Sequence, residues 1–142
     1  MKRNNTLRRA GIVFSFLALA AMLALPAFAK SPKIGTKRPV VAIIRADWCS
    51  ACQKLEPTMM ELISQYKDRI DFVMLDVTDD EKTAQSAAEA RKLGLGKFFE
   101  ANKQKTSTVV VLSASHKIVF QTMQNFDRDA YVKAFDAALA KS

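Results

Sequence analysis

Hydrophobic and polar positions predict alternating strands and helices from residue 39 onward. The run from Val40 to Ala46 is apolar except for Arg45, which is typical of a strand buried on both faces. Apolar residues then recur at helical spacing across residues 50–67, at Leu55, Met59, Leu62, Ile63 and Tyr66. This spacing places them on one face of a helix. A buried strand is therefore expected to lead directly into an amphipathic helix.

The rest of the pattern predicts two further helical regions and three more strands. These are a strand over 70–77, a helix over about 81–93 that resumes over 97–102 after Gly94–Gly96, strands over 109–112 and 118–123, and a last helix from Asp127. The two last strands flank a short turn and so predict a hairpin. The order β-α-β-α-β-β-α indicates an α/β fold, with a central mixed sheet that carries helices on both faces.

The N-terminal pattern differs from the rest and is typical of a secretory signal peptide over residues 1–29. A basic start precedes an apolar stretch from Gly11 to Leu25, and Ala27-Phe28-Ala29 fits an A-x-A cleavage site. The stretch is short for a membrane span of about 20 residues, although an uncleaved anchor remains the alternative. We expect a lead-in segment over 30–38, a domain over 39–142, and a periplasmic or secreted protein.

Outside this N-terminal segment, the net charge says little about function. The net charge is +8, but four basic residues lie in the first ten positions, and without them 18 basic residues against 14 acidic ones leave +4. No Arg-rich stretch with interleaved aromatic residues follows, so nucleic acid is not an expected partner. The length of 142 residues suits one domain. We expect a monomer, although nothing in the sequence determines the oligomeric state.

The only two cysteines form the motif Trp48-Cys49-Ser50-Ala51-Cys52, between the first strand and its helix. The free N–H groups and the dipole of a first helical turn stabilise negative charge, so Cys49 is expected to be partly thiolate. Cys52 lies one turn further on the same face and can reach it. Such a pair can cycle between dithiol and disulfide by exchange with a substrate disulfide.

Two alternatives to redox chemistry stay open from the residues alone. A structural disulfide between Cys49 and Cys52 would close a very short loop and constrain the unfolded chain little. A zinc site would need the single histidine, His116, and a carboxylate to complete the shell. His116 falls in the predicted hairpin turn, where a solvent-exposed residue is the simpler interpretation.

With these motifs in place, residues 39–142 resemble a minimal thioredoxin fold. The resemblance rests on the cysteine motif, Pro57 within the first helix, Leu75-Asp76-Val77 ending the second strand, and the terminal hairpin and helix. Ala46-Asp47-Trp48-Cys49 together with Val77-Thr78 is most similar to the C-terminal periplasmic domain of DsbD, a thiol reductant carrier.

The resemblance implies a thiol–disulfide oxidoreductase in which Cys49 attacks and Cys52 resolves, with no organic cofactor. In this reading no metal-binding residue is expected. It implies partner proteins with thiols or disulfides, a membrane thiol reductant carrier among them. It also implies that the partner contacts the residues around the cysteines, which here are Trp48, Ser50, Ala51, Thr106 and Ser107.

Three positions depart from the family pattern. The family's buried acidic residue is Ile43 here, and a lysine of the second strand is Met74, so neither can help deprotonate Cys52. The family's cis-proline aligns with Ser107, and no proline follows Pro57. A cis bond before serine costs about 3 kcal/mol, so a trans peptide is expected. Without this proline the thiols could also hold a metal or a shared iron–sulfur cluster, which gives the alternative of a metal-binding module with little turnover.

Overall fold

The computed structural model describes residues 38–141. The predicted signal peptide and all but the last residue of the 30–38 segment lie outside the described residues. The elements in chain order are β1 (Val40–Arg45), α1 (Ser50–Tyr66), β2 (Asp71–Asp76), α2 (Asp80–Lys92), α3 (Gly96–Asn102), β3 (Thr108–Leu112), β4 (Ile118–Met123) and α4 (Arg128–Ala140). The α/β class and the predicted order are confirmed, with the interrupted helical region forming α2 and α3.

The four strands form one mixed sheet in the order β2-β1-β3-β4. Strand β1 pairs in parallel with β2 and antiparallel with β3, and β3 pairs antiparallel with β4 as the predicted hairpin. The parallel register sets Ile43 opposite Met74 and Arg45 opposite Asp76. Because β1 is an inner strand, the loop that follows it lies in the middle of the end of the sheet where β1 terminates.

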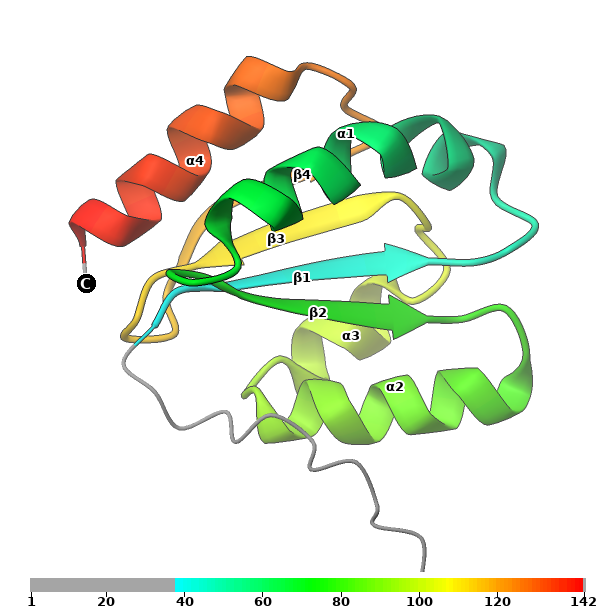
Figure 1. Cartoon of the computed structure of the whole chain (residues 1–142). Coiled ribbons are helices and arrows are strands. Elements are labelled where there is room, and N and C mark those ends of the chain that lie inside the picture. Colours follow the sequence, from blue (N-terminus) through cyan, green and yellow to red (C-terminus); the bar gives the residue numbers. More distant parts are fainter. Residues whose placement is uncertain (1–37, 142) are drawn as a thin grey trace, which may run out of the picture. The chain divides into compact units, whose positions relative to one another are not determined.

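Helices cover both faces of the sheet, with α1 and α4 on one face and α2 and α3 on the other (Figure 1). Alternate residues of β1 serve the two cores, because side chains of a strand point to opposite faces. Val41 and Ile43 pack with α1 and α4, whereas Val40, Ala42 and Ile44 pack with α2 and α3. The continuous apolar run of β1 is therefore explained by burial on both sides.

The helix boundaries follow from local signals. Asp79 caps α2 by accepting a hydrogen bond from the Lys82 amide at 2.8 Å. Asp127 caps α4 in the same way, by accepting a hydrogen bond from the Asp129 amide at 3.0 Å. Gly94 has φ 74°, a left-handed conformation that glycine adopts without a steric penalty, and it follows the C-terminal end of α2. Within residues 38–141, no helix combines the length and apolar character needed to cross a membrane.

Candidate functional site

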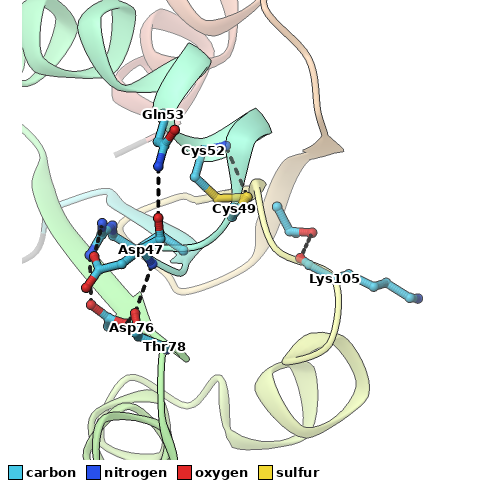
Figure 2. The surroundings of a disulfide bond; sticks show 9 residues. Asp47, Cys49, Cys52, Gln53, Asp76, Thr78 and Lys105 are labelled. Carbon is cyan, nitrogen blue, oxygen red and sulfur yellow. Dashed lines mark hydrogen bonds and ion pairs between the residues drawn. A yellow bond between two sulfur atoms is a disulfide. The ribbon is translucent and has the colours of Figure 1, made fainter.

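Cys49 and Cys52 form a disulfide at the start of α1, with their Cα atoms 5.2 Å apart. Cys49 has extended backbone and occupies the N-cap position, and the Cys52 amide donates a hydrogen bond to its sulfur at 3.1 Å (Figure 2). Both residues are nearly buried, at 6% and 9% exposure. The cysteines therefore sit where the sequence pattern places them, within bonding distance.

The position of Cys49 has a direct electrostatic consequence. The Cys49 amide donates a hydrogen bond to the carbonyl of Ala46 at 3.1 Å, which turns the chain sharply after β1. Its sulfur then takes the place of a capping oxygen and faces the positive end of the helix dipole. When the disulfide opens, a negative charge on this sulfur meets an amide donor and a favourable dipole, which is the environment of a reactive thiol.

The residues flanking the cysteines differ in exposure. Trp48 is 64% exposed, and its indole N–H donates to the Thr78 carbonyl at 3.2 Å, which holds the ring beside the disulfide. Ser50 is exposed at the first position of α1, and Ala51 is half-buried against the cysteine pair. An exposed, anchored aromatic ring provides a flat apolar surface next to the redox pair.

The loop before β3 also reaches the site. Ser107 is fully buried, and none of the peptide bonds in residues 38–141 is cis, so the predicted trans geometry is confirmed. The Ser107 amide donates to the Ile44 carbonyl at 2.8 Å, and its carbonyl accepts from the Gln124 amide at 3.0 Å. Ser107 has φ 62°, which is an unfavourable region for a residue with a side chain. Thr106, beside it, is half-buried.

A small cavity of about 30 Å³ lies beside Cys52. Most of its wall is apolar and includes Ile43, Met74 and side chains of α1, and Ser107 lines it as well. The three positions that depart from the family pattern therefore line one cavity together with the second cysteine. In the described structure this environment offers Cys52 neither a buried carboxylate nor a lysine.

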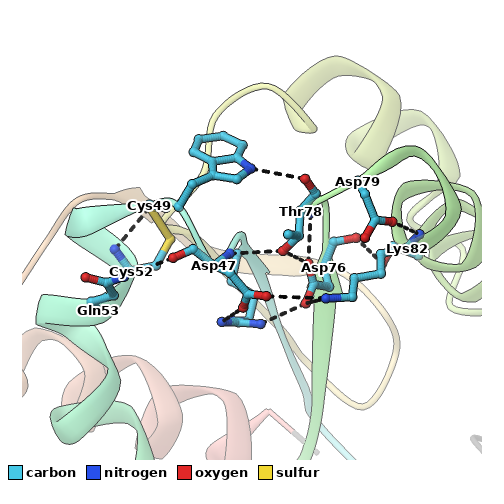
Figure 3. A network of polar contacts seen from close by, with 11 residues as sticks. Asp47, Cys49, Cys52, Gln53, Asp76, Thr78, Asp79 and Lys82 are labelled. Carbon is cyan, nitrogen blue, oxygen red and sulfur yellow. Dashed lines mark hydrogen bonds and ion pairs between the residues drawn. A yellow bond between two sulfur atoms is a disulfide. The ribbon is translucent and has the colours of Figure 1, made fainter.

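A charged network holds the loop that carries Cys49 (Figure 3). The Arg45 guanidinium pairs with Asp47 and with Asp76, each at 2.7 Å. Lys82 adds contacts of 3.3 Å to Asp47 and 3.9 Å to Asp76. Two basic side chains thus meet two carboxylates at the carboxyl ends of β1 and β2, which connects the loop to both strands.

Neutral hydrogen bonds extend this network to the backbone around the motif. The Asp47 amide donates to the Thr78 hydroxyl at 2.9 Å, and that hydroxyl donates to Asp76. The side chain of Gln53, just after Cys52, donates to the Asp47 carbonyl at 2.9 Å. Gln53, after the disulfide, is therefore tied to Asp47 before it, and Asp47 is tied through Thr78 to Asp76 at the end of β2.

The same contacts lower the pKa values of the two carboxyl groups and raise those of the two basic groups. Hydrogen bonds from Arg45, then from Lys82, lower the pKa of Asp47, and the Asp47 carboxylate in turn raises the pKa of Arg45 and of Lys82. For Asp76, burial opposes the charged form, but the Thr78 hydrogen bonds and nearby cations outweigh it and lower its pKa. All four groups are therefore held in their charged forms.

The remaining predicted ligand lies apart from the site. His116 is exposed in the turn between β3 and β4, as the sequence suggests. Across residues 38–141, no group of three or more His, Cys, Asp or Glu side chains is arranged to hold a metal ion. A cluster shared between two chains stays a prediction.

Sequence reasoning found the cysteines but missed the network around Asp47. One available signal was Arg45, the single charged residue in the apolar run, since a charge at the end of a buried strand needs a partner. The parallel register supplies that partner in Asp76. The buried hydroxyl of Ser107 left no such signal, because a serine between two threonines is typical of an exposed loop.

The mixed sheet, the helices on both faces and the disulfide at the start of α1 define a thioredoxin-fold protein with a redox-type cysteine pair. The thioredoxin family model matches residues 27–118, which is more than half of the chain. The chain belongs to the thioredoxin family.

Two curated relatives show where sequence similarity lies. Thioredoxin-like protein HCF164, chloroplastic, from Oryza sativa subsp. japonica is 39% identical over 67 residues, which cover 47% of this chain and 25% of that protein. Thiol:disulfide interchange protein TxlA from Synechococcus elongatus is 33% identical over 90 residues, covering 63% of this chain and 47% of that protein. The matched regions thus span a quarter to a half of these relatives.

A solved structure supports the fold independently. The thiol:disulfide interchange protein of the thioredoxin family from Chlorobium tepidum superposes with a TM-score of 0.52 at 14% identity, covering 72% of this chain and 81% of that one. At this level of identity, the similarity concerns the arrangement of strands and helices.

Proposed function

We propose that the protein is an exported thiol–disulfide oxidoreductase that exchanges disulfides with partner proteins. The observation that carries this proposal is the Cys49–Cys52 disulfide at the helix N-terminus, with an amide hydrogen bond to the Cys49 sulfur. Family membership and the interchange activity in the name of TxlA support the same chemistry. A structural disulfide would need neither this electrostatic setting nor the exposed Trp48 beside it.

The proposed reaction proceeds in two exchanges. The Cys49 thiolate attacks one sulfur of a substrate disulfide, forming a mixed disulfide and releasing one substrate thiolate. The Cys52 thiolate then attacks the Cys49 sulfur, which re-forms the Cys49–Cys52 disulfide and releases the second substrate thiolate. Two electrons pass from the cysteine pair to the substrate, and the same steps in reverse oxidise a dithiol.

Substrate contact is assigned to the rim around the disulfide. Trp48 provides the exposed apolar surface, Ser50 and Ala51 start the helix, and Thr106 and Ser107 form the neighbouring loop. Ser107 is fully buried, so its contribution is restricted to its backbone and to the local shape of the site. Because Ser107 stands where the family has a proline, we expect a partner backbone to bind here differently.

The site of action and the electron supply complete the proposal. The signal-peptide pattern of residues 1–29 supports export to an oxidising compartment, where a dithiol needs a dedicated reductant. The similarity of the motif to the C-terminal domain of DsbD supports a membrane thiol reductant carrier as a partner. Fusing residues 1–38 to a reporter that is active only after export tests the first point.

Insulin reduction with dithiothreitol as electron source tests the activity. The wild-type protein should accelerate precipitation of the insulin B chain, and Cys49→Ser should reduce the rate to the dithiothreitol background. Cys52→Ser, reduced and then freed of dithiothreitol before insulin is added, should accumulate a mixed disulfide with insulin through Cys49, visible on non-reducing gels. A wild-type protein with no activity, or equal activity in Cys49→Ser, would contradict the proposal.

A further inference from the structure

The buried hydroxyl of Ser107 has no use in the oxidised protein. Ser107 is fully buried, and its Oγ finds no hydrogen-bond partner among the described residues. A buried polar group without a partner costs free energy, so such groups in native proteins generally have an explanation. The backbone of this residue is fixed at both ends by Ile44 and Gln124, so the hydroxyl is held in place.

The position of Ser107 suggests which atom it serves. It lines the same small cavity as Cys52, and the wall around them is largely apolar. In the disulfide, the Cys52 sulfur carries no charge and is a weak acceptor. Once the disulfide opens, that sulfur becomes a thiol or thiolate, and a thiolate is a charged acceptor that gains strongly from a buried donor.

We propose that Ser107 is a positioning residue that donates a hydrogen bond to the Cys52 thiolate in the reduced protein and so raises the thiolate population of the resolving cysteine. This inference deepens the proposed function, on which it rests for its role in turnover. It assigns to Ser107 the stabilisation that Ile43 and Met74 cannot give, because neither side chain carries a polar hydrogen or a charge. The Cys52 proton leaves to solvent through the open side of the cavity.

The two charged residues that line this cavity do not take the place of Ser107 as a hydrogen-bond donor to Cys52. Arg45 on β1 and Glu56 on α1 also line it, and β2 contributes the uncharged Met74. Arg45 already donates to Asp47 and Asp76 at 2.7 Å each, so its guanidinium is paired with two carboxylates. Glu56 is exposed on the helix, and its negative charge opposes a second one nearby. Among the groups lining this cavity, Ser107 is the buried, unengaged donor.

The hydroxyl acts at the second exchange of the proposed reaction. The Cys52 thiolate forms its bond to the Cys49 sulfur as the bond between Cys49 and the substrate sulfur breaks, and the electron pair leaves with the substrate thiolate. A larger thiolate fraction of Cys52 speeds this attack at a given pH. The hydrogen bond from Ser107 is given up as the disulfide re-forms, which returns the hydroxyl to its unpartnered state.

A titration of Cys52 alone tests the inference without any substrate. In a Cys49→Ser background, thiolate absorbance near 240 nm reports the ionisation of Cys52 as the pH is raised. Adding Ser107→Ala should leave about ten- to hundredfold less thiolate at a given pH below the midpoint, as expected for the loss of a hydrogen bond to a charged group. The matched control is Ser113→Ala, a buried serine at the opposite end of β3, which should leave the titration unchanged.

Ser107→Gly separates the hydroxyl from the backbone. Alanine keeps a side chain at φ 62°, whereas glycine removes both the hydroxyl and the conformational penalty. The inference requires both variants to lose thiolate equally, with circular dichroism showing that each is folded. An unchanged titration in Ser107→Ala, or a loss in alanine but not in glycine, would overturn it. Inactivity of the wild type on insulin would overturn the proposed function while leaving this titration readable.

Discussion

Ile43 on β1 and Met74 on β2 are register partners, and both line the cavity beside Cys52. The resemblance to thioredoxins places a buried acid and a lysine at these positions. Here the pair is apolar, and Ile43 contributes to the core beneath α1 and α4. The site therefore combines a cysteine pair typical of the family with a more apolar setting for Cys52.

Placing an acidic residue at position 43 should lower the unfolding free energy by an amount that depends on pH. Ile43→Asp buries a carboxyl group whose charged form is disfavoured, so its pKa in the folded protein should lie above the value of about 3.9 in the unfolded chain. The variant should then lose about 3 kcal/mol or more of unfolding free energy at pH 7. Since the neutral acid is the form that folding favours, the loss should shrink as pH falls towards 4. Urea unfolding across this range measures it.

Ile43→Asn is the control for this variant. Its amide has a similar size and polarity but does not titrate, so its stability loss relative to the wild type should stay constant with pH. A loss in Ile43→Asp that is equally flat from pH 4 to pH 8 would show that the introduced acid keeps an ordinary pKa, and that the cavity beside Cys52 is well solvated.

Much of the fold follows from periodicity in the sequence. The run at Val40–Ala46 and the helical spacing after it place the cysteines at a strand–helix junction, and Asp127 marks the last helix. The network around Asp47 does not follow from it, because Asp47 and Thr78 are 31 positions apart and meet only through the register of β1 and β2. Local patterns identify elements, whereas pairing between strands decides which polar side chains meet.

Asp76 is the centre of that network, and its removal should weaken the fold. Asp76→Asn loses the charge that pairs with Arg45 at 2.7 Å. Its amide oxygen can still accept the two Thr78 hydrogen bonds, but its amide NH2 group then faces the Arg45 guanidinium as donor against donor. We expect a loss of about 1 to 3 kcal/mol in unfolding free energy at pH 7. The pKa of Asp76 is lowered in the folded state, so its contribution is present above about pH 4 and lost as pH falls through the folded value.

The pH dependence distinguishes the loss of charge pairing at Asp76 from a general destabilisation of the fold. Urea unfolding should show the gap between wild type and Asp76→Asn narrowing in acid. Asp68→Asn is the matched control, since Asp68 is exposed in the turn after α1, and it should change stability by less than about 0.5 kcal/mol. A gap for Asp76→Asn that stays the same down to pH 2 would argue against charge pairing at Asp76.

Trp48 should matter more for partners than for stability. Its ring is 64% exposed and bound through its indole N–H to the Thr78 carbonyl. Trp48→Ala should therefore cost less than about 1 kcal/mol in unfolding free energy. It should lower activity on a protein disulfide such as insulin several-fold, while reduction of a small disulfide is retained, because only the larger substrate reaches the aromatic surface.

Trp48→Phe is the comparison variant for this prediction. It keeps a flat apolar ring and loses only the hydrogen bond, so its insulin activity should fall between the wild type and the alanine variant. Equal losses on large and small disulfides in Trp48→Ala would instead assign the tryptophan to the reactivity of Cys49, and the assignment of Trp48 to partner contact would be wrong.

Tyr131 should make the stability of the protein depend on pH in the alkaline range. Its ring is fully buried, its hydroxyl donates to the Asn125 carbonyl at 2.6 Å, and burial raises its pKa to about 12. The unfolded chain releases this proton near pH 10, so stability should fall between pH 10 and 12 by roughly 2 to 3 kcal/mol from this group. Tyr131→Phe should remove that part of the alkaline loss, at a cost of about 1 kcal/mol at neutral pH for the lost hydrogen bond.

The second tyrosine allows a direct measurement. Tyr66→Phe leaves Tyr131 as the only phenol in the chain, so phenolate absorbance near 295 nm then reports Tyr131 alone. Its midpoint should lie near 12, as long as circular dichroism shows the protein folded at that pH. A midpoint near 10 in the folded protein would mean that the ring is accessible to water, and α4 would then not pack on the sheet as tightly as its buried face indicates.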